Sequence, residues 1–382
     1  MNSQTVTSAA SDIAQRVLTP AAADNDKRGQ FSTDAVKALG SAGLLGLLLP
    51  AEIGGTSLGP QAFANVVTAL AEADASVAMV FLMHTLASLT VAAAPRTPVL
   101  TRVLSEMASG RHLSTLAFSE TGSRSHFWAP VSRAVSLNGS GARISARKSF
   151  VTSAGHAHSY VTSALSPTGT GPTDSTLYLV LADTKGLSVA GSWDGLGLRA
   201  NASSPVLLDD CVVPPDMRLT SECGGFPAML QIVLPLFNLG QAAVSLGLCR
   251  AVVAATAAHL RSARFEHLGA TLGEALPNLR AQLATMQIET DGLAARIDDT
   301  IRHLEQPGEL TMLRVLESKA AAGEIAIAVT SLAMRTCGGA AFSRQTGIER
   351  CFRDAQAGAV MAPTNDVLRE FIGKSLLGLP LF

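Results

Sequence analysis

Few side chains in this 382-residue sequence stand where they could carry chemistry. His84 lies in the apolar run 81–86, and an apolar setting keeps an imidazole neutral and usable as a base. A single histidine in such a run is more often a core residue. Gly338 and Gly339 precede a helical pattern and would let a backbone approach a pyrophosphate, although a lone glycine pair is usually just a loop. The sequence has no Ser-His-Asp pattern, nucleophile elbow, CxxC pair or Cys/His cluster, so it supports neither hydrolysis, a metal site nor a disulfide framework.

The composition indicates closely packed helices rather than a nucleic-acid or membrane protein. There are 29 Lys and Arg against 30 Asp and Glu, which gives no attraction to nucleic acid or an anionic membrane. The start of the chain lacks the basic and apolar blocks of a signal peptide, so we expect a cytoplasmic protein. The uncharged stretch 228–249 is interrupted by polar residues such as Asn238 and Gln241, which favours a buried helix over a membrane span.

Three blocks of different texture divide the chain, and they predict an α+β fold. Residues 1–112 and 220–382 have apolar residues at helical spacing, which predicts an N-terminal helical domain and a C-terminal helical domain. Residues 113–219 alternate short β-branched runs with turn residues, which predicts a middle domain with an antiparallel sheet or barrel. The expected strands are 113–118, 142–146, 159–163, 175–181, 186–190 and 204–208. The expected helices include 61–73, 76–93, 229–264, 277–304, 310–337 and 362–377. An active site is expected at the seam between the blocks.

Several short segments recur in a fixed order along the chain. They are 43–55 with its Pro50 and Gly54-Gly55 turn, Ser119 to Ser125 (SETGSRS), Lys148 to Ser153 (KSFVTS), 196–199 with 206–214, Lys319 with Glu324, and Cys337-Gly-Gly339 followed by Arg353-Asp-Ala355. Their order and spacing resemble the acyl-CoA dehydrogenase family over nearly the whole chain. The resemblance implies that family's fold, with a C-terminal four-helix bundle. It also implies a flavin-dependent oxidoreductase with FAD as its cofactor and FMN as the alternative.

The resemblance places the flavin between the middle domain and the bundle. It implies that the ring is bound by Leu116, Phe118, Ser119, Phe150, Val151 and Thr152, with Thr152 donating to the flavin N5. The rest of the cofactor would meet Gly338, Gly339, Thr364, Asp366, Arg335 and, across a dimer interface, Arg264. The alternatives are an ordinary core strand at 113–118, a solvent-facing Thr152, and solvated arginines at 264 and 335. The family also implies a homodimer or homotetramer.

Two departures stand in the loop that resembles the family's flavin loop. Arg124 stands where the family has Gly, and Thr121 where it has Pro. A bulky side chain thus replaces a residue suited to close backbone approach. Arg335 stands where the family has a phosphate-facing Gln.

The glutamate that serves the family as a base has no counterpart here. Counting from Arg353-Asp-Ala355 puts Ala362 at its position, and the region 234–237, where some members place the base, contains no acid. A thioester's α-proton needs a positioned base. The candidates to replace it are His84, His126 and Ser125. For His126 a surface position is the alternative, and Glu222 is best interpreted as a loop acid.

Three hypotheses remain open from the sequence. The first is an acyl-thioester dehydrogenase with a displaced base, acting on a CoA or carrier-protein substrate. The second is a monooxygenase of the same fold that uses oxygen and reduced flavin supplied by a flavin reductase. The third is a non-catalytic homologue, which Arg124 and Ala362 would suit.

Overall fold

The computed structural model describes residues 2–137, 139 and 141–382, and its first part is helical. The helices are α1 (Ser3–Ile13), α2 (Thr19–Arg28), α3 (Thr33–Ser41), α4 (Pro60–Ala73), α5 (Ala75–Ala92) and α6 (Pro98–Ala108). The Asp74 side chain caps α5 by accepting from the backbone N–H groups of Ser76 and Val77. Nearly every side chain of α5 is buried, so this helix lies at the centre of the molecule.

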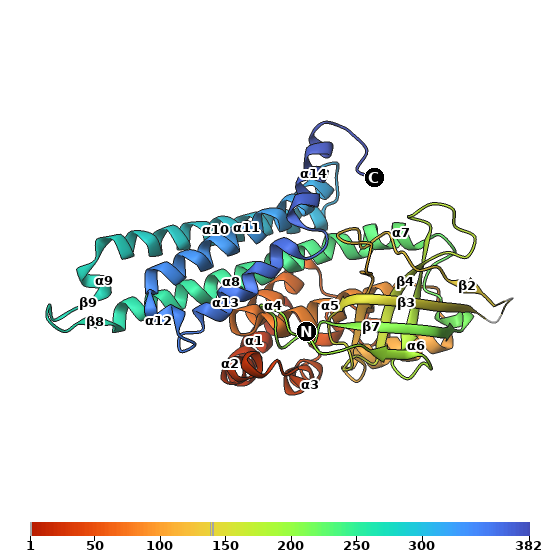
Figure 1. Cartoon of the computed structure of the whole chain (residues 1–382), viewed down its shortest axis with the longest axis horizontal. Helices are drawn as coiled ribbons and strands as arrows, with labels where there is room; N and C mark the ends of the chain where they lie inside the picture. The colour runs from red at the N-terminus through yellow and green to blue at the C-terminus, as the bar shows by residue number, and fades with distance from the viewer. Residues whose placement is uncertain (1, 138, 140) are drawn as a thin grey trace.

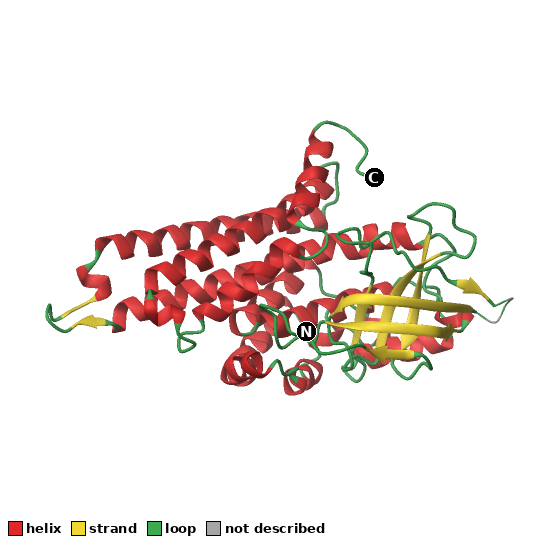
Figure 2. Cartoon of the chain, viewed as in Figure 1, coloured by secondary structure: helices red, strands yellow, loops and turns green. Residues whose placement is uncertain are grey.

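The middle domain holds two sheets that lie beside the N-terminal helices (Figures 1 and 2). One sheet has the order β1 (Ser114–Ala117), β4 (Ser159–Leu165), β5 (Ser175–Leu181). The other has the order β2 (Val135–Ser136), β3 (Ala142–Val151), β7 (Ser204–Val213), β6 (Leu187–Val189). All pairs within these sheets are antiparallel except β1 with β4, which is parallel with Ser114 opposite Ser159. The prediction of a purely antiparallel sheet is wrong there, because the long connection through β2 and β3 permits a parallel return.

The C-terminal part is a bundle of long helices that extends away from the sheets (Figure 1). Its long helices are α8 (Leu234–Ser262), α10 (Pro277–Glu305), α11 (Thr311–Cys337) and α13 (Ile348–Val360), followed by α14 (Asn365–Leu376). The short elements are α7 (Gly225–Ala228), β8 (Arg264–Phe265), β9 (Ala270–Thr271), α9 (Leu272–Ala275) and α12 (Gly339–Phe342). The expected helix 362–377 starts later than predicted, because the Thr364 hydroxyl caps it by accepting from the Val367 N–H and Pro363 precedes that cap.

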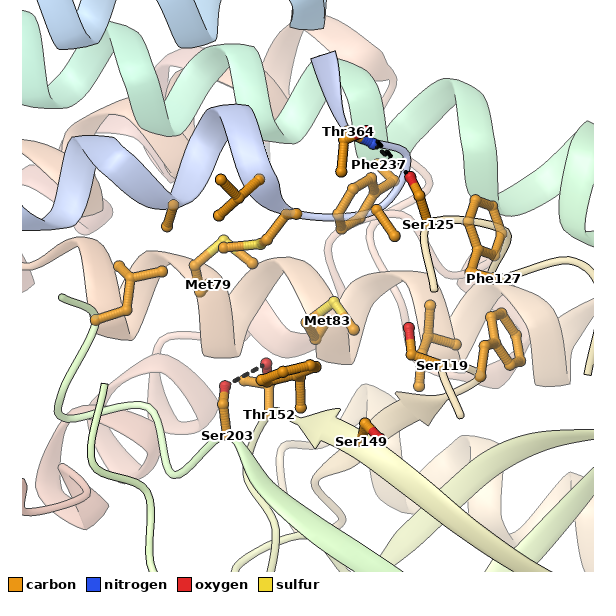
Figure 3. A pocket seen from close by; sticks show the side chains of 18 of the residues that line it. Met79, Met83, Ser119, Ser125, Phe127, Ser149, Thr152, Ser203, Phe237 and Thr364 are labelled. Carbon is orange, nitrogen blue, oxygen red and sulfur yellow. Dashed lines mark hydrogen bonds between the residues drawn. The ribbon is translucent and has the colours of Figure 1, made fainter. Parts of the chain in front are cut away.

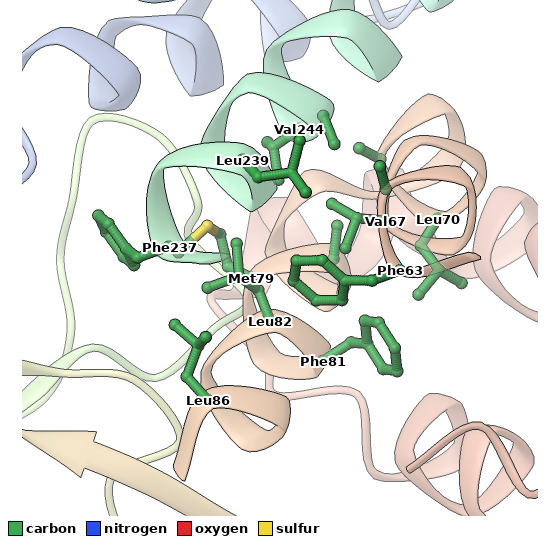
Figure 4. Packing of buried hydrophobic residues seen from close by; sticks show 14 of the residues in the cluster. Phe63, Val67, Leu70, Met79, Phe81, Leu82, Leu86, Phe237, Leu239 and Val244 are labelled. Carbon is green, nitrogen blue, oxygen red and sulfur yellow. The ribbon is translucent and has the colours of Figure 1, made fainter. Parts of the chain in front are cut away.

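The core joins the N-terminal helices to the bundle. Figure 4 shows Phe63, Val67 and Leu70 of α4 facing Leu239 and Val244 of α8, with Phe81 and Leu82 of α5 beside them; all of these side chains are at least 95% buried. This arrangement of a helical part, two sheets and a helical bundle confirms the predicted α+β class.

Among the described residues, three helical segments are long and apolar enough to cross a membrane by length and composition alone. They are Ala75–Ala92, Gly225–Ser262 and Thr311–Cys337. In the structure their most apolar windows are 83%, 83% and 50% buried, so much of this apolar surface packs inside the protein. Burial of the polar residues within 228–249, such as Asn238 and Gln241, agrees with the buried helix predicted there.

His84 joins three parts of the N-terminal half. It is fully buried on α5, its Nδ1 accepts from the Ser114 N–H at 3.0 Å, and its Nε2 lies 3.1 Å from the Leu45 carbonyl oxygen. Burial lowers the pKa of His84 to about 4, and the neighbouring His112, also with a lowered pKa, adds to the effect. Neutral His84 is therefore a structural link between α5, β1 and the turn Leu44–Gly46.

We predict that acid destabilises the protein through His84. The pKa falls from about 6.5 in the unfolded chain to about 4 in the folded one, so the unfolded state binds the extra proton. The stabilisation is complete above pH 6.5, falls as the pH drops toward 4 and levels off below. His84 alone should cost about 2 kcal/mol between pH 7 and pH 5.

Urea unfolding at several pH values measures this dependence. His84→Gln should flatten the slope of unfolding free energy against pH by nearly one proton, whereas Asn278→Ala, which removes an exposed side chain that does not titrate, should leave it unchanged. An unaltered slope in His84→Gln would contradict the assignment.

Candidate active site

A cavity of about 630 Å³ lies where α5, the middle domain and the turn before α14 meet. Its apolar wall comes from Met79 and Met83 of α5 and Phe237 of α8 (Figure 3). Val360 at the end of α13 and the following Met361 complete it. The opposite side carries most of the polar groups. These are residues of the β1 end, the following loop, β3 and the segment before β7: Ser119, Thr121, Ser125, Ser149, Thr152, Asn201 and Ser203. The cavity is thus apolar toward the helices and polar toward the sheets.

A buried ion pair fixes the loop 119–125 at the cavity. Lys148 Nζ of β3 lies 2.5 Å from Glu120 Oε1 and 2.5 Å from the Ser163 carbonyl oxygen of β4. Glu120 also accepts from the backbone N–H groups of Val131 and Ser132 and from the Ser132 hydroxyl. Burial by itself would raise the pKa of Glu120, but this set of donors outweighs burial and lowers the pKa below its ordinary value. Glu120 is consequently an anchored carboxylate rather than a free base.

The turn before α14 is held by a second buried lysine. Lys319 Nζ of α11 donates to the carbonyl oxygens of Gly358 at 3.1 Å, Met361 at 3.2 Å and Pro363 at 2.8 Å. Burial lowers the pKa of Lys319 to about 7. A cation at the C-terminal end of α13 also suits the helix dipole. This contact fixes the backbone on both sides of Ala362, which is half-buried and lines the cavity.

A hydroxyl pair connects the loop to this turn. Ser125 Oγ accepts from the Thr364 N–H at 2.9 Å and lies 3.2 Å from Thr364 Oγ1 (Figure 3). On the sheet side Thr152 Oγ1 and Ser203 Oγ are 3.2 Å apart. Hydroxyls from four different segments therefore face the cavity from two sides.

A bulge in β3 exposes an aromatic ring to the cavity. The register with β7 shifts between Lys148 and Val151, and Phe150 has a φ of +54°. Phe150 is 71% exposed and meets Trp193 edge to face with ring centroids 6.3 Å apart. Phe150 thus offers an apolar ring among the residues that line the cavity.

Seven of the residues predicted for a site come together at this cavity. They are Leu116, Phe118, Ser119, Ser125, Phe150, Thr152 and Thr364. Val151 lies behind them in β3, buried against the sheet core rather than lining the cavity. Sequence reasoning missed Met79, Met83, Trp193 and Ser203. The spacing of Met79 and Met83 puts them on one face of α5, but nothing local marks that face as different from the core.

Two candidate bases lie elsewhere. His84 does not line the cavity, and its ring nitrogens are taken up by Leu45 and Ser114, so the structure corrects the prediction that it acts as a base. His126 is exposed, stacks on Trp128 at 5.0 Å and does not line the cavity either. Of the candidates, only Ser125 reaches the cavity.

Five predicted cofactor residues also lie outside the cavity. Arg264, Arg335, Gly338, Gly339 and Asp366 are all exposed. Arg264 donates to the Gly269 carbonyl oxygen at 2.6 Å in the hairpin β8–β9. Figure 1 shows that this hairpin and α12, which begins at Gly339, lie at the end of the bundle far from the sheets. Within one chain, therefore, the cavity is not approached by the four bundle residues Arg264, Arg335, Gly338 and Gly339.

Free carboxylates do not occur among the described residues that line the cavity. Glu120 is the one acid there, and Lys148 holds it. Ala362 occupies the turn, while Val233 and Phe237 line the wall from the start of α8. A ligand in this cavity therefore meets hydroxyls, thioethers and aromatic rings, with Arg124 as the cation among the described lining residues.

Comparison with known proteins gives matches along nearly the whole chain. Family models described as the N-terminal, middle and C-terminal domains of acyl-CoA dehydrogenase match residues 2–111, 115–211 and 224–377. The chain is 25% identical to a probable acyl-CoA dehydrogenase, YngJ, of Bacillus subtilis, over 96% of this chain and 95% of that protein. It is also 25% identical to cyclohex-1-ene-1-carbonyl-CoA dehydrogenase of Geobacter metallireducens, with the same coverage of both chains.

Solved structures share the fold of this chain, which confirms the predicted acyl-CoA dehydrogenase fold. Butyryl-CoA dehydrogenase from Megasphaera elsdenii superposes with a TM-score of 0.91 at 21% identity, covering 98% of both chains. An FAD complex of PigA superposes with a TM-score of 0.90 at 19% identity, covering 99% of this chain and 97% of the other.

We predict that Glu120→Ala destabilises the protein by about 3–5 kcal/mol, because it leaves Lys148 buried without its counter-charge. Asp12→Ala, which removes the partner of Arg16 in an exposed pair, should change stability by less than about 1 kcal/mol. Denaturant unfolding of both variants measures the difference. Equal losses of unfolding free energy in the two variants would show that the buried pair matters no more for stability than the exposed pair.

Proposed function

The chain belongs to the acyl-CoA dehydrogenase family, and from this premise we propose that it is an FAD-dependent oxidoreductase of an acyl thioester, carried on CoA or a carrier protein, or of a related substrate. The observation that carries the proposal is the cavity itself. It gathers the end of β1, the loop 119–125, the bulge of β3 and the turn before α14 around one space, although these segments lie far apart in sequence.

The residues at the cavity suit a flavin ring. The strand β1 lies at the edge of its sheet, so one row of its backbone N–H and C=O groups is outside the ladder and could meet the polar edge of the ring. Exposed Phe150 offers an apolar face, and Thr152 offers a hydroxyl to N5. The likeness to a structure that is an FAD complex supports FAD over FMN. When bound, FAD would supply the acceptor for a hydride from the substrate.

The four bundle residues would reach a cofactor only in an oligomer. Arg264, Arg335, Gly338 and Gly339 are exposed at the far end of the bundle. We therefore propose that a second copy of the chain presents them to the adenosine end of FAD, as a homodimer or homotetramer would allow. Such an assembly would also cover the ring of Phe342 in α12, which is 85% exposed in the single chain. We also propose that the protein is cytoplasmic.

The proton chemistry sets this chain apart from its family. The turn holds Ala362 firmly beside the cavity, and anchored Glu120 cannot take a proton without breaking its pair with Lys148. A substrate proton would therefore pass to water or to a group on the substrate itself. The same lack of a free carboxylate favours a second candidate, a monooxygenase that uses reduced flavin from a flavin reductase and oxygen.

Purified protein tests these proposals through its absorbance. We expect flavin bands that bleach when an acyl thioester is added without oxygen. Bleaching only by an external reductant, followed by oxygen-dependent product formation, would favour the monooxygenase. A colourless protein that binds neither FAD nor reduced flavin would contradict both and leave a non-catalytic homologue.

We predict that Ala362→Glu raises acyl-CoA oxidation by at least about tenfold, because a positioned general base contributes roughly 10²–10⁴-fold. Val360→Glu places the same charge elsewhere on the cavity lining and is the matched control. Steady-state assays across several acyl chain lengths measure the gain. No gain at any length would count against a thioester substrate.

A further inference from the structure

Arg124 brings an unneutralised positive charge to the cavity. It is the one cation among the described residues that line this space, and in that part of the chain no hydrogen bond or ion pair engages its guanidinium. The other charged lining residue, Glu120, is matched by Lys148. Counted together with Lys148, the partner of Glu120, the charged groups at the cavity sum to about +1, and no described residue pairs with Arg124.

The backbone at Arg124 has an unfavourable conformation for its residue type. Its φ is +48°, in the left-handed region that suits glycine and disfavours residues with a Cβ. The resemblance described above implies glycine at this position. A residue with a Cβ costs more than glycine in this conformation, so the backbone alone does not favour an arginine at this position.

The groups around the cavity mouth suit an anion. Ser125 and Thr364, whose hydroxyls meet at 3.2 Å, join the loop of Arg124 to the start of the twelve-residue helix α14. The helix start contributes a partial positive charge. Asp366 in its first turn is 95% exposed, does not line the cavity and lies 3.7 Å from Arg369. Arg124 and the hydroxyls of Ser125 and Thr364 thus lie on neighbouring segments of the cavity lining.

We propose that Arg124 is a specificity-determining residue that pairs with a carboxylate or phosphate of the molecule in the cavity. The planar guanidinium can bind either group through two parallel hydrogen bonds. The uncharged part of that molecule then lies against Met79, Met83 and Phe237. This inference deepens the proposed function and rests on it for the cofactor. The anion comes either from the substrate or from the diphosphate of FAD.

The test compares Arg124→Met, Arg124→Lys and Arg124→Gly with Arg143→Met, which removes an exposed arginine of β3 outside the cavity. Arg124→Gly controls for misfolding, because glycine suits the backbone there. Binding of FAD and of riboflavin, which lacks phosphate, is measured by fluorescence. Binding of hexanoate and of uncharged hexanamide to FAD-loaded protein is followed by the shift of the flavin bands.

If the anion is on the substrate, Arg124→Met and Arg124→Gly weaken hexanoate at least about tenfold and leave hexanamide and FAD unchanged. If it is the diphosphate, they weaken FAD by a similar factor and leave riboflavin unchanged. Arg124→Lys keeps part of the affinity in either case, and Arg143→Met keeps all of it. Unchanged affinity for both hexanoate and FAD in Arg124→Met and Arg124→Gly overturns the proposal.

Calorimetry with inorganic pyrophosphate and with hexanoate separates this inference from the proposed function. A chain that binds no flavin but binds either anion through Arg124 retains the inference, while the proposed function fails. A chain that binds flavin with no dependence on Arg124 for any anion retains the function and loses the inference.

Discussion

The buried pair of Lys148 and Glu120 is the contact on which the site depends. Lys148 comes from β3 of one sheet, Ser163 from β4 of the other, and Glu120 from the loop after β1, so one ammonium group joins three segments. Removing two charges from water costs several kcal/mol per ion, and their attraction repays this only with further hydrogen bonds. The donors from Val131 and Ser132 supply those bonds. The pair therefore specifies one loop position more than it adds stability, and it withdraws the cavity's single carboxylate from acid–base chemistry.

Lys319 applies the same principle on the other side of the cavity. Its ammonium group donates to the carbonyl oxygens of Gly358, Met361 and Pro363 and so holds the turn. Burial lowers the pKa of Lys319 to about 7, so this ammonium group loses its proton more easily than that of an ordinary lysine. Ser125 then connects the two anchored segments through Thr364. Because both segments are fixed from behind, residues that face the cavity, such as Ala362 and Arg124, can change without loss of the frame. This arrangement therefore permits the chemistry of the cavity lining to change while the shape of the cavity is kept.

The sequence predicted the parts of the fold that depend on local pattern. The strand 175–181 and the helix starting at 277 were placed correctly, because alternation and helical spacing are read from neighbours in sequence. The parallel partner of β1 and the two backbone contacts of His84 are set by segments 30 to 45 residues away. The order of motifs brought Leu116, Thr152 and Thr364 to the site. That order held no information on Met79 or on the partners of His84, since a buried helix face and a cavity wall have the same composition.

Two positions of the cavity lining differ in charge from what the resemblance to the family implies. Ala362 stands where the resemblance implies a glutamate and Arg124 where it implies a glycine, so the lining would lack one negative charge and gain one positive charge. Two unit charges about 8 Å apart interact by roughly 2 kcal/mol at an effective dielectric constant of about 20. A shift of two charge units at such distances would thus favour an anionic ligand by several kcal/mol over its neutral analogue. It would also favour substrates whose oxidation builds up negative charge, because the arginine would stabilise that charge as it forms. Losing the base and gaining the cation are therefore best understood as one change in electrostatics rather than as two separate losses.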